Sequence, residues 1–269
     1  MIDSYHLYLT SSKALLRKES GLPWKRKIEL VGESGWNASQ PSSLALHGAT
    51  GGKRLRPTLC LYVGSALCKF MVLDLPPTLR NDRERRVAAL AQMQHQLGLE
   101  AGAWEVSLDA LEVGGKFLAC AIPRALAERL RTLSKESGLR LVSVRPYFAA
   151  VWNAQVASLV ANEAQTQALL AIESDAFTSL VAKDGKVVAI SAMPHHSETG
   201  LVEREIKRLT FSMGAQAVAS LRVVFAKEVQ ELSQAYADKR VCTGSDVSGL
   251  PYADFRELLS HDHTGQGAA

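Results

Sequence analysis

The stretch that decides the fold is ALLAIESDAFTSLVAKDGKVVAIS, residues 168–191. It holds three runs of apolar and β-branched residues, at Ala168–Glu173, Thr178–Ala182 and Val187–Ser191. Between the second and third runs stands Asp184-Gly185, a dipeptide typical of two-residue hairpin turns. The pattern predicts three antiparallel strands that follow one another in the chain.

Strand and helix patterns on both sides of this meander predict a mixed α/β chain with two related halves. The other predicted strands are Tyr5–Thr10, Lys13–Lys18, Ile28–Val31, Thr58–Val63, Lys69–Leu75, Trp104–Leu108, Phe117–Ile122, Leu139–Val144 and Leu221–Phe225. The predicted helices are Asp82–Leu97, one that Pro123 opens and Gly138 ends, Tyr147–Leu159, Leu201–Met213 and Lys227–Ala237.

The composition is that of an ordinary globular protein. Of the 269 residues, 47% are hydrophobic and 22% charged, which excludes collagen-like, coiled-coil and wholly disordered chains. The first ten residues lack a basic segment followed by an apolar one, so no secretory signal is predicted. No run approaches the roughly 18 apolar residues of a membrane span. We therefore expect a cytoplasmic protein.

The domain boundaries predicted from these patterns divide the chain into two lobes and a tail. The first lobe is expected at 58–160, the second at 161–240, and a loose C-terminal tail at 241–269. Residues 1–57, with N-terminal strands and a flexible link, are assigned to the first lobe. An appendage outside that lobe is the alternative.

Positive charge is concentrated at the start of the chain. Residues 1–86 carry 14 Lys and Arg against 7 Asp and Glu, a net of +7, whereas the whole chain has a net charge of +4. The candidate docking residues are Lys25, Arg26, Lys27, Lys53, Arg54 and Arg56. We interpret them as a surface for an acidic partner segment or an anionic membrane. An ordinary solvated surface is the alternative.

Motifs for nucleotide or metal chemistry are not found. The Gly-rich piece 48–52 before Lys53 fails the phosphate-loop pattern G-x-x-x-x-G-K-[ST], because His47 and Arg54 stand where Gly and Ser or Thr are needed. His195, His196, His261 and His263 are expected to be solvated in loops. Cys60, Cys68, Cys120 and Cys242 form no C-x-x-C pair and are expected to be reduced and buried. The sequence thus predicts neither a catalytic residue nor a metal site.

A family resemblance rests on three stretches. The strand-then-helix phrase SVRPYFAA, residues 143–150, is similar to the crossing between halves in PilM-type proteins and in the cytoplasmic part of GspL/EpsL-type proteins. Leu61–Leu75 together with Trp104–Ser107 resembles small PilM-like proteins, and the meander resembles the start of the second half of actin-like ATPases. The resemblance covers about 58–226. It implies a two-lobed, actin-like α/β fold, duplicated from a ribonuclease H-like unit.

Two departures from actin-like ATPases concern the hairpins that hold phosphates in that family, each with an Asp and a Gly. The first hairpin would be Leu7–Ser12, which has neither residue. In the second, Ala171–Thr178, the metal-facing Asp falls on Ala171 and no Gly occurs; Asp175 is either a relocated acid or a turn residue. The resemblance therefore implies a degenerate nucleotide site. ATP is the one cofactor that the family suggests.

The function that follows from the resemblance is a non-catalytic cytoplasmic scaffold, peripheral to the inner membrane, of a type IV pilus or type II secretion machine. It implies a PilN-like bitopic inner-membrane partner. The sequence lacks the C-terminal membrane span of GspL-type proteins, so the PilM-like arrangement is favoured. The alternatives are an actin-like ATPase or kinase with atypical phosphate loops and, third, a basic nucleic-acid-binding module, which is not expected.

Overall fold

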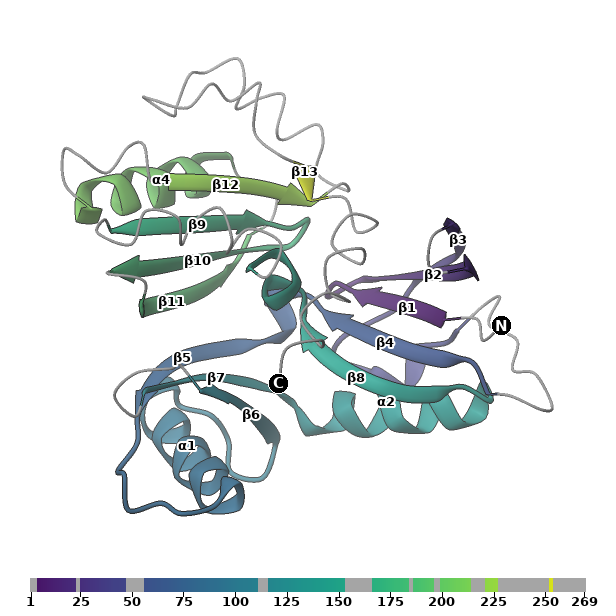
Figure 1. Cartoon of the computed structure of the whole chain (residues 1–269), viewed down its shortest axis with the longest axis horizontal. Helices are drawn as coiled ribbons and strands as arrows, with labels where there is room; N and C mark the ends of the chain where they lie inside the picture. The colour runs from purple at the N-terminus through teal and green to yellow at the C-terminus, as the bar shows by residue number, and fades with distance from the viewer. Residues whose placement is uncertain are drawn as a thin grey trace. The chain divides into compact units, whose positions relative to one another are not determined.

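The computed structural model describes residues 4–22, 25–46, 56–110, 116–152, 166–183, 186–195, 199–213, 221–226 and 252–253 (Figure 1). The chain divides into two compact units. The first comprises Met1–Lys69, Arg86–Ser107 and Cys120–Tyr147; the second comprises Phe70–Arg85, Leu108–Ala119 and Phe148–Ala269. None of the helices in the described ranges is long and apolar enough to cross a membrane.

The first unit is built on a five-stranded sheet with the order β3-β2-β1-β4-β8. Its strands are β1 (Ser4–Leu9), β2 (Lys13–Leu22), β3 (Lys25–Gly35), β4 (Thr58–Val63) and β8 (Arg140–Pro146). β1 pairs antiparallel with β2 and parallel with β4, while β2–β3 is antiparallel and β4–β8 parallel. The N-terminal strands therefore lie in the same sheet as β4 and β8.

The second unit repeats this topology strand for strand. Its sheet has the order β11-β10-β9-β12-β13. The strands are β9 (Gln167–Ile172), β10 (Ala176–Lys183), β11 (Lys186–Pro194), β12 (Leu221–Ala226) and β13 (Tyr252–Ala253). β9–β10 and β10–β11 are antiparallel, and β9–β12 and β12–β13 are parallel, the same directions as in the first sheet. The two related halves predicted from the sequence are present as duplicated sheets.

A third sheet has three strands in the order β5-β7-β6: β5 (Lys69–Asp74), β7 (Lys116–Pro123) and β6 (Trp104–Ala110). Helix α1 (Asp82–Leu97) starts at a side-chain cap formed by Asn81. The Glu84 amide donates to Asn81 Oδ1 at 2.9 Å, and Asn81 Nδ2 donates back to the Glu84 carboxylate at 2.7 Å. This reciprocal pair satisfies a backbone donor that the first helical turn leaves unbonded.

Helix α2 (Arg124–Glu136) packs against β8 along one apolar stripe (Figure 1). Its buried residues are Leu126, Ala127, Leu130, Leu133 and Ser134, which recur at helical spacing. Gly138, with φ of +67°, ends the helix: its amide donates to Lys135 O and the Leu139 amide to Ser134 O. This Schellman geometry needs the left-handed conformation that glycine adopts without strain.

Helix α4 (Thr199–Met213) joins β11 to β12 and contacts β9. Val202, Ile206 and Leu209 are buried on one side of it. A further helical segment at residues 147–152 follows β8. Two short 3-10 helices, η1 (Pro41–Ser43) and η2 (Ser65–Leu67), lie in connections.

Most predicted elements are present, and the differences lie at their ends. The expected loop from residue 32 is wrong at its start, because β3 continues to Gly35, paired with Lys13 of β2. In the predicted loose tail, Tyr252–Ala253 pairs with β12. The predicted helix at 227–237 and the Asp184-Gly185 turn lie outside the described residues. Lys183 pairs with Lys186, so Asp184 and Gly185 are the two residues between the paired strands in the sequence.

Trp36 fastens the segment after β3 to the β1–β2 turn. Its indole Nε1 donates to Thr10 O at 2.9 Å and to Lys13 O at 3.1 Å, and its amide donates to Ser12 O at 2.9 Å. The side chain is only 7% exposed. Lys13 O also accepts from the Thr10 amide at 2.9 Å, so the indole hydrogen bond matters most for Thr10 O.

Replacing Trp36 with Phe should remove the indole donor and keep most of the apolar contact. We expect a loss of about 1–3 kcal/mol in the free energy of unfolding, the typical cost of leaving a buried acceptor unpaired. Urea denaturation measures it. The matched control is Trp104→Phe, because Trp104 is half-buried in β6. Equal losses in the two variants would show that the Trp36 hydrogen bonds contribute nothing.

Candidate functional site

The β1–β2 turn is one of the two places where an actin-like fold would hold phosphate. Here the Thr10 hydroxyl oxygen accepts from the Lys13 amide at 3.0 Å and from the Ser12 amide at 3.4 Å. The Thr10 amide donates to Lys13 O at 2.9 Å. Three amides of this turn are therefore bonded inside the hairpin. A phosphate would have to displace these bonds to reach the amides.

The β9–β10 turn is the second such place, and it is also closed on itself. Glu173 donates its amide to Ala176 O at 2.8 Å, across Ser174 and Asp175. His195 holds the outer side of the turn: its amide donates to Asp175 O at 2.9 Å, and its ring Nε2 lies 2.8 Å from Glu173 O. The turn has no glycine, so a side chain is present at each position where backbone would need to approach a phosphate.

His195 was expected to be solvated, and that prediction is wrong. It is 1% exposed, and its ring stacks on Phe177 with the centroids 6.1 Å apart. The burial comes from the turn itself, because the imidazole replaces water as the partner of a backbone carbonyl. His196, His261 and His263 lie outside the described residues.

The acidic residues of the second turn do not assemble a metal site within the described ranges. Glu173 is fully buried and Asp175 is half-buried. In the part of the chain that the structure describes, no group of three or more His, Cys, Asp or Glu side chains is placed to hold a metal ion. The role of Asp175 as a relocated acid stays a prediction.

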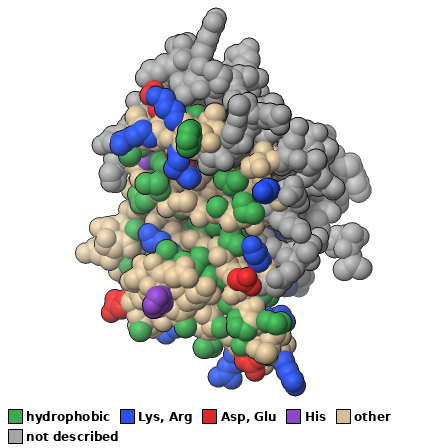
Figure 2. Space-filling model, turned by 90° about the vertical axis from the view of Figure 1, so that its left-hand side faces the viewer, with side chains coloured by type: hydrophobic (Ala, Val, Ile, Leu, Met, Phe, Trp, Pro, Cys, Tyr) green, Lys and Arg blue, Asp and Glu red, His purple; other side chains and the backbone are tan. Residues whose placement is uncertain are grey.

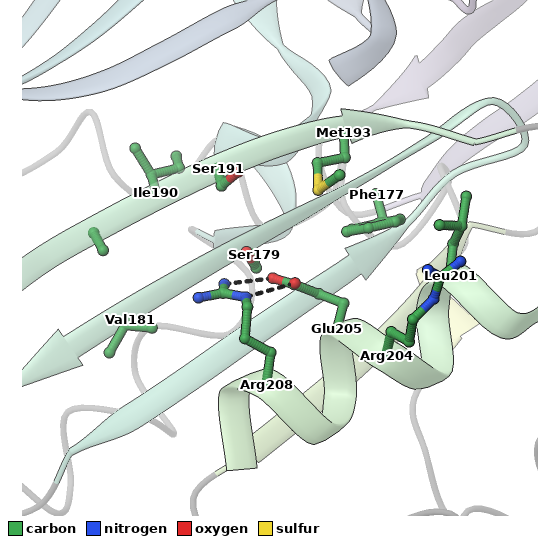
Figure 3. A pocket seen from close by; sticks show the side chains of 11 residues that line it. Phe177, Ser179, Val181, Ile190, Ser191, Met193, Leu201, Arg204, Glu205 and Arg208 are labelled. Carbon is green, nitrogen blue, oxygen red and sulfur yellow. Dashed lines mark hydrogen bonds and ion pairs between the residues drawn. The ribbon is translucent and has the colours of Figure 1, made fainter. Parts of the chain in front are cut away.

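A groove of about 370 Å³ lies within the second unit, between α4 and the β10–β11 hairpin (Figure 3). Its floor comes mainly from alternate residues of the two paired strands, with Ile190 in addition, and its wall from one face of α4. The lining residues are Phe177, Ser179, Val181, Ala189, Ile190, Ser191, Met193, Leu201, Arg204, Glu205 and Arg208. The strand register explains the floor, because Phe177 pairs with Met193 and Ser179 with Ser191.

An ion pair on α4 lies over this floor. Arg208 Nε donates to Glu205 Oε2 at 2.7 Å and its Nη2 to Oε1 at 2.6 Å, a bidentate arrangement that Figure 3 shows beside Ser179. Burial raises the pKa of Glu205, but the hydrogen bonds and the charge of Arg208, with the polar Ser179 hydroxyl nearby, lower it by more. The pKa of this carboxyl therefore lies below its ordinary value.

The residues that line the groove suit binding better than catalysis. The described lining residues are apolar side chains, two serines, two arginines and one glutamate, and none of them is His, Cys or Lys. Among these described residues no base is placed to activate either serine, since Glu205 is held by Arg208. A groove of this size with a few placed polar groups is typical of ligand-binding surfaces.

Sequence reasoning missed this groove because its residues come from three elements. Two signals were available: the alternation of Phe177, Ser179 and Val181 along a strand, and the i, i+3, i+4 and i+7 spacing of Leu201, Arg204, Glu205 and Arg208. Neither signal says by itself which strand faces which helix.

The predicted docking residues are only partly described. Lys27 is exposed on β3 and pairs with Glu29, and Arg56 is exposed before β4. Lys25 and Arg26 lie in β3, but their side chains are outside the description, as are Lys53 and Arg54 altogether. On the face that Figure 2 shows, Lys and Arg side chains are interspersed with hydrophobic ones. That the basic residues form one surface stays a prediction.

Polar residues also occur inside the first unit. His6 Nε2 lies 3.1 Å from Glu19 Oε2, with the two residues 2% and 8% exposed.

Cys68 is buried as predicted, whereas the expected burial of Cys60 and Cys120 is wrong, because both are half-buried. Cys60 of β4 is paired with His6 of β1 on one side and with Ser143 of β8 on the other, so its neighbours across the sheet are polar.

The low pKa of Glu205 makes a pH-dependent prediction. A carboxyl with a depressed pKa stabilises the fold above its ordinary value of 4.5 and loses that contribution as pH falls through its folded-state pKa. We expect Glu205→Gln to lower the free energy of unfolding at pH 7 and to lower it less at pH 3, as measured in urea. Glu128→Gln, at an exposed position of α2, is the control. Equal effects of Glu205→Gln at both pH values would contradict the prediction.

Comparison with known proteins gives matches in structure and none in sequence. No family model matches the sequence, and no curated protein matches it either. A Bacteroides thetaiotaomicron protein with an actin-like ATPase fold and unknown function superposes with a TM-score of 0.58 at 8% identity, covering 96% of this chain and 94% of that one.

Two further solved structures are similar. The PilM–PilN type IV pilus biogenesis complex matches with a TM-score of 0.55 at 11% identity, covering 98% of this chain and 99% of that one. The cytoplasmic domain of EpsL, an inner membrane component of the Vibrio cholerae type II secretion system, matches with a TM-score of 0.50 at 7% identity over 83% and 81%. The resemblance read from the sequence is thus confirmed at the level of the fold: the chain has the actin-like ATPase fold, as these proteins do.

Proposed function

We propose that this chain is a non-catalytic, cytoplasmic assembly scaffold that docks on an inner-membrane partner of a type IV pilus or type II secretion machine. The observation that carries the proposal is the closure of the β1–β2 turn. Its amides bond to the Thr10 hydroxyl and to Lys13 O, so they are not presented to a phosphate. A protein with an actin-like fold that does not bind phosphate in these turns can still use its surfaces to bind other proteins.

The structural neighbours support the assembly role. One is PilM in complex with PilN, and another is the cytoplasmic domain of an inner membrane secretion component. Each has this fold over most of its length. The proposal extends the roles of these two proteins to the present chain, with a PilN-like membrane protein as the partner.

The docking surface that we propose for this partner is the basic N-terminal region, with Lys25, Arg26, Lys27, Lys53, Arg54 and Arg56. Of these, Arg56 is exposed and Lys27 is exposed beside Glu29. Clustered cations attract an acidic peptide or an anionic leaflet at low to moderate ionic strength.

Nucleotide binding is the alternative function, since the fold is that of ATPases. If the turns are closed as described, 1 mM Mg-ATP should leave the melting temperature unchanged in a thermal-shift assay. A ligand at 100 times its Kd stabilises a fold by about 2.7 kcal/mol, which such an assay detects readily. A clear rise, with binding in the micromolar range, would replace the scaffold by a nucleotide-binding protein.

The partner proposal predicts a specific capture from membranes. The immobilised full chain should retain one bitopic inner-membrane component of a pilus or secretion machine from detergent extracts, identified by mass spectrometry. The double variant Lys27→Glu/Arg56→Glu should lose it. The control Arg124→Glu/Lys135→Glu reverses two exposed charges on α2 and should keep it. Retention of soluble metabolic proteins alone would count against the scaffold.

A further inference from the structure

Strand β11 forms one edge of the second sheet and has no charged residue from Val187 to Pro194. Among the described residues, no strand pairs with its outer side. An edge strand presents N–H and C=O groups that can pair with another chain, and proteins usually protect such an edge with charged side chains or bulges. The bulge in this hairpin lies at Val181 and Ala182, near one end of the strand.

Several side chains of β11 are also exposed, although the strand is largely apolar. Val188 and Met193 are each 44% exposed. Ala189 and Ser191 are exposed as well and line the groove beside α4. The exposed edge and the groove thus form one continuous surface of the second unit.

The wall of this groove carries a second arginine, Arg204, which forms no ion pair with any acidic side chain in the described ranges. Arg204 is exposed, and its Nε donates to Gly200 O at 3.2 Å, a bond within its own helix. Arg208 already holds Glu205. The lining residues that the structure describes therefore include two arginines and one glutamate, and Figure 3 shows Arg204 beside Leu201 at the end of the groove near Phe177 and Met193.

We propose that the outer edge of β11 and the adjoining groove bind an extended, acidic segment of a partner protein, which adds to the second sheet as a strand. Its backbone would pair with β11, and its acidic side chains on one face would meet Arg204 and Arg208. Strand addition of this kind takes affinity from main-chain hydrogen bonds and specificity from alternate side chains.

The spacing of the two arginines fits this occupant. Residues four apart on a helix are separated by about 6 Å along its axis, and alternate residues of a strand by about 6.6 Å. Two carboxylates at positions i and i+2 of the added strand can therefore face Arg204 and Arg208 in turn.

Charge argues for a partner over a second copy of this chain. Pairing two β11 edges would bring the arginines of one groove toward those of the other, and like charges in close proximity oppose association. An acidic segment instead neutralises Arg204. This surface is separate from the basic N-terminal residues proposed above, so the inference does not rest on the proposed function.

Fluorescence anisotropy of labelled peptides on the full chain tests the proposal. The probe is an eight-residue peptide of alternating Glu and Val; the controls replace every Glu with Lys, or methylate alternate backbone nitrogens. We expect saturable binding of the acidic peptide alone. Arg204→Ala should weaken it at least fivefold, whereas Lys207→Ala, at an exposed lysine of α4 that does not line the groove, should leave it unchanged.

Each other outcome overturns the proposal. The proposed charge recognition is wrong if the Lys peptide binds equally well or if Arg204→Ala has no effect. The proposed strand pairing is wrong if the methylated peptide binds undiminished. The whole proposal is wrong if the acidic peptide does not bind. Sedimentation of the chain alone identifies the competing occupant: a dimer that Ser191→Lys dissociates would assign the edge to a second copy. The test uses neither membranes nor nucleotide, so its failure leaves the scaffold proposal standing.

Discussion

The structure depends on two central strands that are buried on both faces. β1 is buried from Tyr5 to Leu9, and β9 from Ala168 to Ile172. Such a strand must be nearly free of charge, and its backbone groups must be paired on both sides, because water reaches neither. In each unit a hairpin supplies one neighbour and a parallel strand the other. The central places of β1 and β9 in the two sheets agree with this requirement.

The sequence predicted these strands because apolar runs and turn residues are local signals. The meander at 168–191 is present as β9, β10 and β11, and Gly138 marks a helix end as expected. The parallel pairing of β1 with β4 could not be derived from periodicity, since it joins distant segments. Two other errors have the same origin. His195 is buried by a turn 20 residues earlier in the chain, around Asp175, and the groove combines two strands with a helix.

The two units share a topology but close their first turns by different chemistry. In the first, the Thr10 hydroxyl accepts backbone amides and Trp36 donates to the carbonyls. In the second, the His195 ring lies beside Glu173 O and its amide donates to Asp175 O. Both turns are therefore held by contacts from within the protein.

The duplicated topology also sets an order of events in folding. The antiparallel hairpins join neighbouring segments, whereas Ser4 and Thr58, which meet across β1 and β4, are 54 residues apart. Closing that long loop costs more chain entropy than closing a hairpin, so the hairpins form first and the parallel pairs limit the rate. The β10–β11 hairpin is then present, with its uncharged edge uncovered, before its sheet is complete. During synthesis this edge therefore needs protection from association with other nascent chains.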